Sequence, residues 1–106
     1  MRRIHIAIGV IDIAASVTDY TRRLGAPPVV VVSGDYALWR TDTINLSIRR
    51  VAAGMAGQLR HLGWEDAASE AFTVETDVNG IAWERFTAEQ QAGEIQSAWP
   101  DADYLP

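Results

Sequence analysis

The sequence contains no cysteine and no lysine among its 106 residues. The absence of cysteine excludes disulfides and thiolate metal sites, and the absence of lysine excludes Schiff-base chemistry. With only four prolines, 22% charged residues and 48% hydrophobic residues, the composition excludes a disordered or collagen-like chain. We therefore expect one globular domain, residues 1–106, with enough apolar side chains to form a core.

Basic residues are also scarce. Nine arginines against 14 acidic residues give a net charge of −5 and a pI near 4.8. Proteins that track phosphates normally carry a basic face and a high pI, so we expect no nucleic-acid partner. The apolar run from Ile4 to Ile13 is interrupted by His5 and Asp12 and is too short to span a bilayer, so we expect no membrane association and a cytoplasmic location.

The first half of the chain, about residues 3–51, has the pattern of a βαβββ unit. Hydrophobic side chains alternate along residues 3–10, which predicts a strand. Asp12 then offers an N-cap, and apolar residues three and four apart predict a helix that ends at Gly25. The β-branched and alternating segments that follow predict three strands, over residues 29–32, 36–40 and 43–49.

The second half, about residues 58–99, follows a linker at 52–57 and is shorter than the first. Only the 22 residues 62–83 separate His61 from Glu84, whereas a complete βαβββ unit needs about 40 residues. We therefore expect this unit to lack its helix and one strand. Its predicted elements are strands over 59–65, 72–75 and 81–86, the last two forming a hairpin, and a weakly patterned helix over 87–99.

These elements predict an α+β fold in which βαβββ modules form a curved, cup-shaped mixed sheet with helices on its outer face. Four polar side chains, His5, Asn45, His61 and Glu84, alternate with the hydrophobic side chains of their strands, so they could converge on the open face. Two imidazoles and a carboxylate suit Fe, Mn, Zn or Ni. A polar strand face turned to solvent would show the same alternation, so spacing alone leaves both interpretations open.

Several motifs resemble the vicinal oxygen chelate superfamily, which includes glyoxalase I, extradiol dioxygenases, fosfomycin-resistance enzymes and bleomycin-resistance proteins. The resemblance rests on the strand at 4–10, the helix that begins at Asp12, the segment Arg60–Gly63 and the segment Asp77–Glu84. It covers the first module well, from residue 3 to about residue 50.

In the metal-dependent members of that superfamily, the ligands come from the first, fourth, fifth and eighth strands. The resemblance implies that His5, His61 and Glu84 are metal ligands and that Asn45 is a fourth ligand or a substrate contact. Asn45 stands where glyoxalase I-like enzymes have a glutamate, which disfavours isomerisation of a thiohemiacetal. Fosfomycin-type sites also use lysine, which this chain lacks. The ligands that the dioxygenase branch needs are all present.

Other residues have two interpretations each. Extradiol cleavage needs further proton shuttles, for which Tyr36 or Tyr104 would have to serve. Arg49–Arg50 could hold an anionic substrate or form a solvated strand end. The four tryptophans could line an aromatic pocket or belong to the core, and they are Trp39, Trp64, Trp83 and Trp99.

We therefore expect a divalent-metal-dependent enzyme of lyase, dioxygenase or transferase type, without an organic cofactor, acting on a small oxygen-chelating substrate. The alternative is a metal-free binding module that sequesters a small aromatic or hydrophobic ligand, as bleomycin-resistance-like proteins do. A degenerate copy that serves only as an interaction partner is a third possibility. Because the shortened second module cannot complete a two-module cup, we also expect a homodimer.

Overall fold

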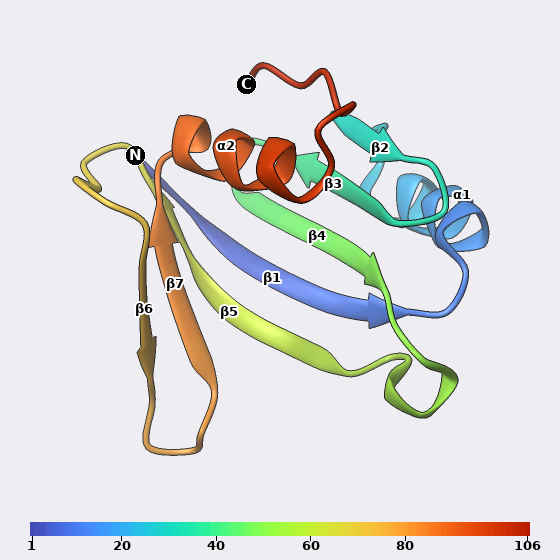
Figure 1. The fold of residues 1–106 in the computed structure, drawn as a ribbon, viewed down its shortest axis with the longest axis horizontal. Helices are drawn as coiled ribbons and strands as arrows, with labels where there is room; N and C mark the ends of the chain where they lie inside the picture. The colour runs from blue at the N-terminus through green and yellow to red at the C-terminus, as the bar shows by residue number, and fades with distance from the viewer.

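The computed structural model describes all residues 1–106 and confirms an α+β fold built on one open, curved, seven-stranded mixed sheet (Figure 1). The strand order is β2-β3-β4-β1-β5-β7-β6. The elements are β1 (Arg2–Val10), α1 (Ile13–Leu24), β2 (Val30–Val32), β3 (Tyr36–Arg40), β4 (Ile44–Arg50), η1 (Ala53–Met55), β5 (Leu59–Asp66), β6 (Thr73–Thr76), β7 (Ala82–Phe86) and α2 (Ala88–Ala98). Neither helix has the length and the run of apolar residues that crossing a bilayer requires.

The first module has the predicted βαβββ order, and local signals define its helix. Asp12 caps α1 by accepting a hydrogen bond from the Ala15 amide at 3.0 Å, and Gly25 ends the helix in the left-handed conformation with φ +68°. The apolar stripe of α1 packs on a core cluster that includes Trp39 and Ile48, both fully buried. β1 then pairs in parallel with β4, which closes the module.

The second module is shortened as predicted, because no helix lies between β5 and β7. β6 and β7 form the expected antiparallel hairpin, whose turn is held by Asp77, and β7 runs parallel to β5. β5 also pairs antiparallel with β1. The two modules therefore share one continuous sheet, and the first strand of each lies at its centre.

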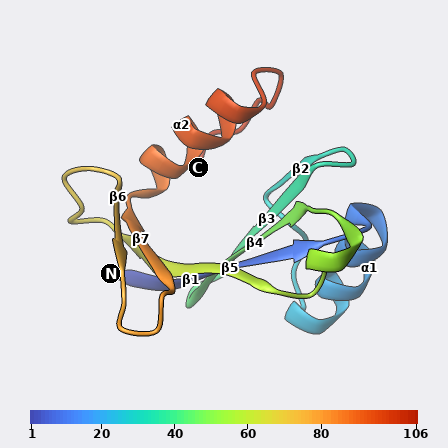
Figure 2. The ribbon, with the colours of Figure 1, turned by 60° about the horizontal axis from the view of Figure 1, so that its bottom comes forward.

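The two helices lie on opposite faces of this sheet, which corrects the expectation that both cover the outer face. Figure 2 shows α1 on one side and α2 on the other. On the face opposite α1, Ile95 of α2 packs with Tyr36 and Leu38. This inner face carries buried polar groups that need hydrogen-bond partners, and Gln91 of α2 supplies two of those bonds. The helix after Glu84 thus covers the inner face.

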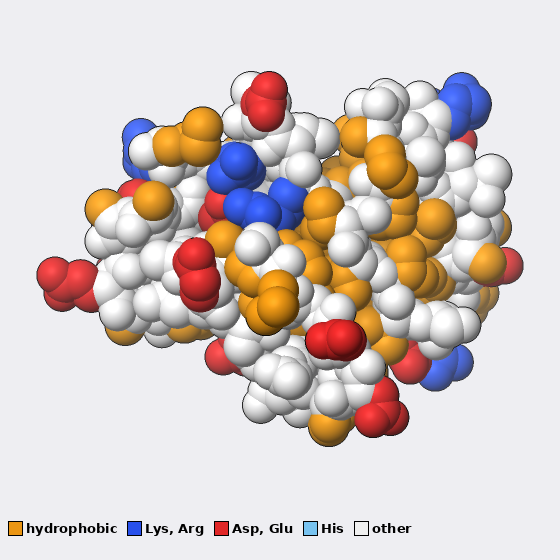
Figure 3. Space-filling view, turned by 90° about the horizontal axis from the view of Figure 1, so that it is seen from above, with side chains coloured by type: hydrophobic (Ala, Val, Ile, Leu, Met, Phe, Trp, Pro, Cys, Tyr) orange, Lys and Arg blue, Asp and Glu red, His pale blue; other side chains and the backbone are white.

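Both edges of the sheet lack a neighbouring strand. The β2 edge exposes Val31 and the preceding Val29 by 48% and 43%, and Figure 3 shows hydrophobic side chains gathered over the part of the molecule where β2 lies. Every residue of β6 is exposed, including Val74. Free backbone groups and exposed apolar side chains at an edge favour association with another strand.

Gly63 of β5 explains how closely β7 can approach. A Cβ atom at this position would overlap with the backbone carbonyl of Glu84, the residue beside it on β7. Gly93, within α2, has nothing within 4 Å of the position that a Cβ would occupy. The two glycines therefore differ in what an added methyl group would meet.

We predict that Gly63→Ala destabilises the protein by about 1–3 kcal/mol, because the methyl group must push β7 away from β5. Gly93→Ala is the matched control and should stabilise by about 1 kcal/mol, since alanine is the better helix former and the space is open. Urea unfolding of both variants measures the two changes. Equal effects would contradict this account of Gly63.

Candidate metal centre

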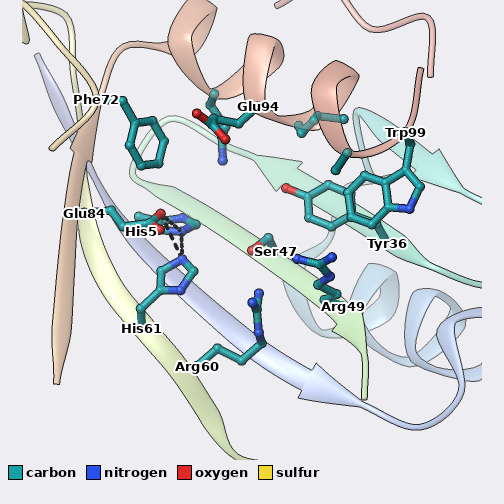
Figure 4. A pocket seen from close by; sticks show the side chains of 13 residues that line it. His5, Tyr36, Ser47, Arg49, Arg60, His61, Phe72, Glu84, Glu94 and Trp99 are labelled. Carbon is teal, nitrogen blue, oxygen red and sulfur yellow. Dashed lines mark hydrogen bonds and ion pairs between the residues drawn. The ribbon is translucent and has the colours of Figure 1, made fainter. Parts of the chain in front are cut away.

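The three candidate ligands come from three neighbouring strands and point toward one another (Figure 4). The sheet register places His5 of β1 beside Gly63 of β5, and Gly63 beside Glu84 of β7. His61 precedes Gly63 by two residues and therefore lies on the same face. Because Gly63 has no side chain, the backbone of Glu84 can lie close against β5, which brings the Glu84 side chain near the two histidines.

The distances between the three ligand atoms are short. Nε2 of His5 lies 2.9 Å from Nε2 of His61, and Oε1 of Glu84 lies 3.0 Å from His61 Nε2 and 3.7 Å from His5 Nε2. These side chains form a group able to hold a metal ion. Ligand atoms at right angles around one metal, each bonded at about 2.0–2.2 Å, lie about 3 Å apart. The spacing and the donor set, two imidazoles and one carboxylate, both fit a divalent ion.

Hydrogen bonds on the Nδ1 side of the ring fix the orientation of His5. Its Nδ1 lies 2.9 Å from Oδ1 and 3.1 Å from the backbone oxygen of Asn45, and both of these atoms are acceptors. Nδ1 therefore carries the proton, and the lone pair of Nε2 faces His61 and Glu84. Phe86 packs edge-on against the His5 ring at 5.0 Å between centroids. His5 is only 3% exposed, so it has little freedom to turn.

Asn45 is itself held by two other side chains. Its Nδ2 donates to Oε1 of Glu65 at 2.8 Å and to Oε1 of Gln91 at 2.8 Å, while Nε2 of Gln91 donates to Asn45 Oδ1 at 3.0 Å. A carboxylate at neutral pH only accepts hydrogen bonds, so Glu65 determines which end of the Asn45 amide faces His5. In metal sites, a ligating histidine typically has such a fixed hydrogen-bond partner on its other ring nitrogen.

The structure places Asn45 away from the position expected of a fourth ligand or a substrate contact. It is fully buried on the Nδ1 side of His5, its side-chain polar atoms are occupied, and it does not line the cavity beside the ligands. Strand phase predicts only which face a side chain shares, and α2 covers this part of the face. A glutamate at position 45 would meet the carboxylate of Glu65.

Glu65 is the buried anion that accepts hydrogen bonds in this network, and its role could not be read from the sequence alone. Arg3 donates to it at 2.6 Å, and Arg40 donates at 2.7 and 3.0 Å. Burial works to raise the pKa of Glu65, but the hydrogen bonds from Arg40 and Asn45 and the charges of both arginines outweigh burial and lower the pKa to about 2. Glu65 stands four residues after His61 on β5, so strand alternation could have predicted that both side chains lie on the same face. Nothing in the sequence pattern could have predicted the contact of Gln91 with Asn45.

A cavity of about 170 Å³ adjoins the three ligands, between the inner face of the sheet and α2. Figure 4 shows Arg49 and Arg60 on its strand side and Trp99 and Glu94 on its helix side. The lining residues are His5, Tyr36, Ser47, Arg49, Arg60, His61, Phe72, Glu84, Gln91, Glu94, Ile95, Ala98 and Trp99. The cavity therefore combines the candidate ligands with aromatic and positively charged groups.

Burial sets the protonation of several cavity groups. It lowers the pKa of His5, despite the opposing hydrogen bond with Asn45, and so keeps the imidazole neutral and able to coordinate. Burial also raises the pKa of the Tyr36 hydroxyl, which therefore stays protonated at neutral pH. Partial desolvation of Arg60 and repulsion from the nearby charge of Arg49 lower the pKa of Arg60, although both side chains are exposed.

The tryptophans and tyrosines differ in their surroundings, and Trp64 and Trp83 belong neither to the core clusters nor to this cavity. Trp39 is fully buried in the core and donates to the backbone oxygen of Ala26, whereas Trp99 lines the cavity. Of the two tyrosines considered as proton shuttles, Tyr36 lines the cavity and Tyr104 does not. Of the tryptophans for which the sequence left both interpretations open, Trp39 thus belongs to the core and Trp99 to the cavity.

No family model matches the chain, and no curated protein matches it. Among solved structures, one similar chain comes from a crystal structure described as that of an NAD-dependent benzaldehyde dehydrogenase from Legionella pneumophila. The two chains are 13% identical, with a TM-score of 0.54 over 79% of this chain and 97% of the other. At this identity, the likeness concerns the fold alone.

We predict that Glu65→Gln lowers the free energy of unfolding at pH 7 by roughly 3 kcal/mol, because the native carboxylate has a pKa of about 2 against a usual 4.5. This stabilisation is complete above about pH 4.5 and is lost as the pH falls toward 2. The difference between wild type and variant should therefore shrink over that range in urea unfolding. Glu70→Gln, which changes an exposed acid, is the control. A constant difference would contradict the role of the charge.

Proposed function

We propose that this chain binds a divalent metal ion through His5, His61 and Glu84 and acts on a small substrate with two adjacent oxygens, as proteins of the vicinal oxygen chelate type do. The observation that carries the proposal is the convergence of three donor atoms, 2.9–3.7 Å apart, beside a cavity. When bound, the metal would act as a Lewis acid that polarises substrate oxygens. The reaction is of lyase, dioxygenase or transferase type.

The chain's own residues have separate roles in this proposal. Asn45, backed by Glu65, keeps the Nε2 lone pair of His5 directed at the metal position. The Tyr36 hydroxyl, protonated at neutral pH because its pKa is raised, can donate a hydrogen bond to a ligand in the cavity. Glu94 lines the cavity outside the ligand triad and can accept a proton there. α2 covers one side of the cavity and limits water access.

A second candidate function is a metal-free binding module for a small aromatic ligand. The observation in its favour is the aromatic lining of the cavity by Tyr36, Phe72 and Trp99. A module of that kind has no need of three converging metal-ligand side chains. Metal binding therefore separates the two functions.

We predict that protein stripped with a chelator binds one equivalent of Zn²⁺, Ni²⁺ or Mn²⁺ in isothermal titration. Loss of a ligand should weaken binding more than a change in the supporting network, which typically costs 10–100-fold, so His61→Ala and Glu84→Gln should each weaken it by more than about 100-fold. Glu75→Gln, an exposed acid on neighbouring β6, is the control and should bind as wild type. Binding of one equivalent by His5→Ala with wild-type affinity would contradict this ligand set, and failure of the wild type to bind any of the three metals would favour the metal-free module.

We also propose that the chain forms a homodimer by pairing of β6 with β6 of a second copy. β6 is a free edge next to β7, which carries Glu84, and all its residues are exposed. α2 already packs on its own sheet, so we propose the sheet edge and not this helix as the contact.

Light scattering at micromolar concentration should give a mass of about 23 kDa, twice the 11.6 kDa of one chain. Val74→Lys, which places a charge on β6, should yield the monomer. Val31→Lys places the same charge on the β2 edge and should leave the dimer intact. A wild-type monomer, or dissociation by Val31→Lys alone, would show that β6 is not the interface.

A further inference from the structure

Two arginines that line the cavity have no acidic partner within the chain. Six of the nine arginines form ion pairs, and they are Arg3, Arg22, Arg23, Arg40, Arg50 and Arg85. Arg2 lies over the ring of Trp64 instead. Arg49 and Arg60 remain unpaired although acidic residues outnumber basic ones by 14 to 9, and both line the cavity beside the candidate ligands. The cavity thus has two arginines that form no ion pair, together with the carboxylates of Glu84 and Glu94.

A β-bulge accounts for the position of Arg60. Strict alternation would direct Arg60 and His61 to opposite faces of β5. The pairing of β1 with β5 shifts between Ala7 and Ile8, where Ala7 pairs with His61 and Ile8 pairs with Leu59. Arg60 is the additional residue, and its side chain lines the same cavity as that of His61. Bulges re-aim side chains in this way and are frequent beside functional sites.

Arg49 is held by an aromatic contact, so its hydrogen-bond donors stay available. Its Cζ atom lies 5.1 Å from the centroid of the Trp99 ring, and that ring packs against Tyr36 with centroids 4.8 Å apart. A guanidinium over an aromatic face keeps its N–H groups at its edge, where they can donate to an oxyanion. Figure 4 shows Arg49 and Arg60 directed into the cavity from the strand side.

We infer that Arg49 and Arg60 form an oxyanion subsite, so that the ligand of this cavity is a small molecule bearing a carboxylate or phosphate group. The inference rests on the proposed function for the role of His5, His61 and Glu84 at the other end of the ligand, but the arginine subsite itself needs no metal. The volume of about 170 Å³ is suited to a ligand with a single ring, since a cavity of about 150 Å³ in another protein holds benzene.

The acidic residues of the cavity limit where the anionic group can lie. Glu84 belongs to the ligand triad, and Glu94 lies on α2, where it forms no ion pair with either arginine. Both carboxylates repel an anion, so the subsite is confined to the strand side between Arg49 and Arg60. Glu94→Gln should therefore raise the affinity for an anion.

The test uses metal-free protein and three probes in isothermal titration: benzoate, its neutral analogue benzamide, and inorganic phosphate. Benzoate should bind at least about tenfold more tightly than benzamide, because charge-assisted hydrogen bonds exceed neutral ones by about that factor. Arg49→Gln and Arg60→Gln should each lower benzoate affinity about tenfold. Comparison of benzoate with phosphate distinguishes a carboxylate ligand from a phosphate ligand.

Arg50→Gln is the matched control, because Arg50 follows Arg49 on β4, pairs with Asp35 and does not line this cavity. It should leave benzoate affinity unchanged. Equal affinities for benzoate and benzamide, together with failure of phosphate to bind, would overturn the inference, as would equal losses in Arg49→Gln and Arg50→Gln. His61→Ala should lose metal binding but retain benzoate, which separates failure of the metal proposal from failure of this one.

Discussion

The buried carboxylate of Glu65 is the interaction on which the rest of this site depends. It lies on β5 but is bonded to Arg3 on β1, Arg40 on β3 and Asn45 on β4, so it ties together four strands from both modules. An unpaired buried anion would be strongly destabilising, and these donors remove that penalty. The same carboxylate orients Asn45 and, through it, the His5 imidazole. Folding and the orientation of a candidate metal ligand therefore rely on one set of hydrogen bonds.

Backbone geometry, more than side-chain size, then shapes the space around His5. Gly63 lies between His5 and Glu84 in the sheet and lets the backbone of β7 lie close against β5. A few residues away, the bulge at Arg60 breaks the alternation of β5 and adds a cation to the same face. Regular pairing would have directed Arg60 to the face opposite His61. A glycine and an irregularity thus produce a site that a uniform sheet would lack.

Most of the architecture could be predicted from the sequence, because hydrophobic alternation, helix caps and loop lengths all indicate the same order of elements. Alternation predicted the strands, and Asp12 and Gly25 predicted the limits of α1. Strand phase also predicted that His5, His61 and Glu84 share a face, and the structure brings them together. The short interval between His61 and Glu84 predicted the missing helix of the second module.

The features that sequence reasoning missed depend on tertiary packing. The helix over 88–98 has a weak apolar pattern, and its position on the inner face follows from contacts of Gln91 and Ile95 with distant strands. Burial of Asn45 follows from that packing, which is why its phase alone suggested a ligand position. The bulge at Arg60 leaves no mark in the sequence pattern, because two strands must pair before a shift in their register exists.

The placement of α2 has a consequence for motion. This helix contributes one wall of the cavity, yet it forms no ladder of hydrogen bonds with the sheet and is held on it by the side chains of Gln91 and Ile95. Separating α2 from the sheet would leave all seven strands paired, so this opening requires less free energy than global unfolding. A ligand that touches both walls binds only the closed form and adds its binding free energy to closure. Amide hydrogens of residues 88–98 should accordingly exchange more slowly when the cavity is filled, so that the helix reports occupancy.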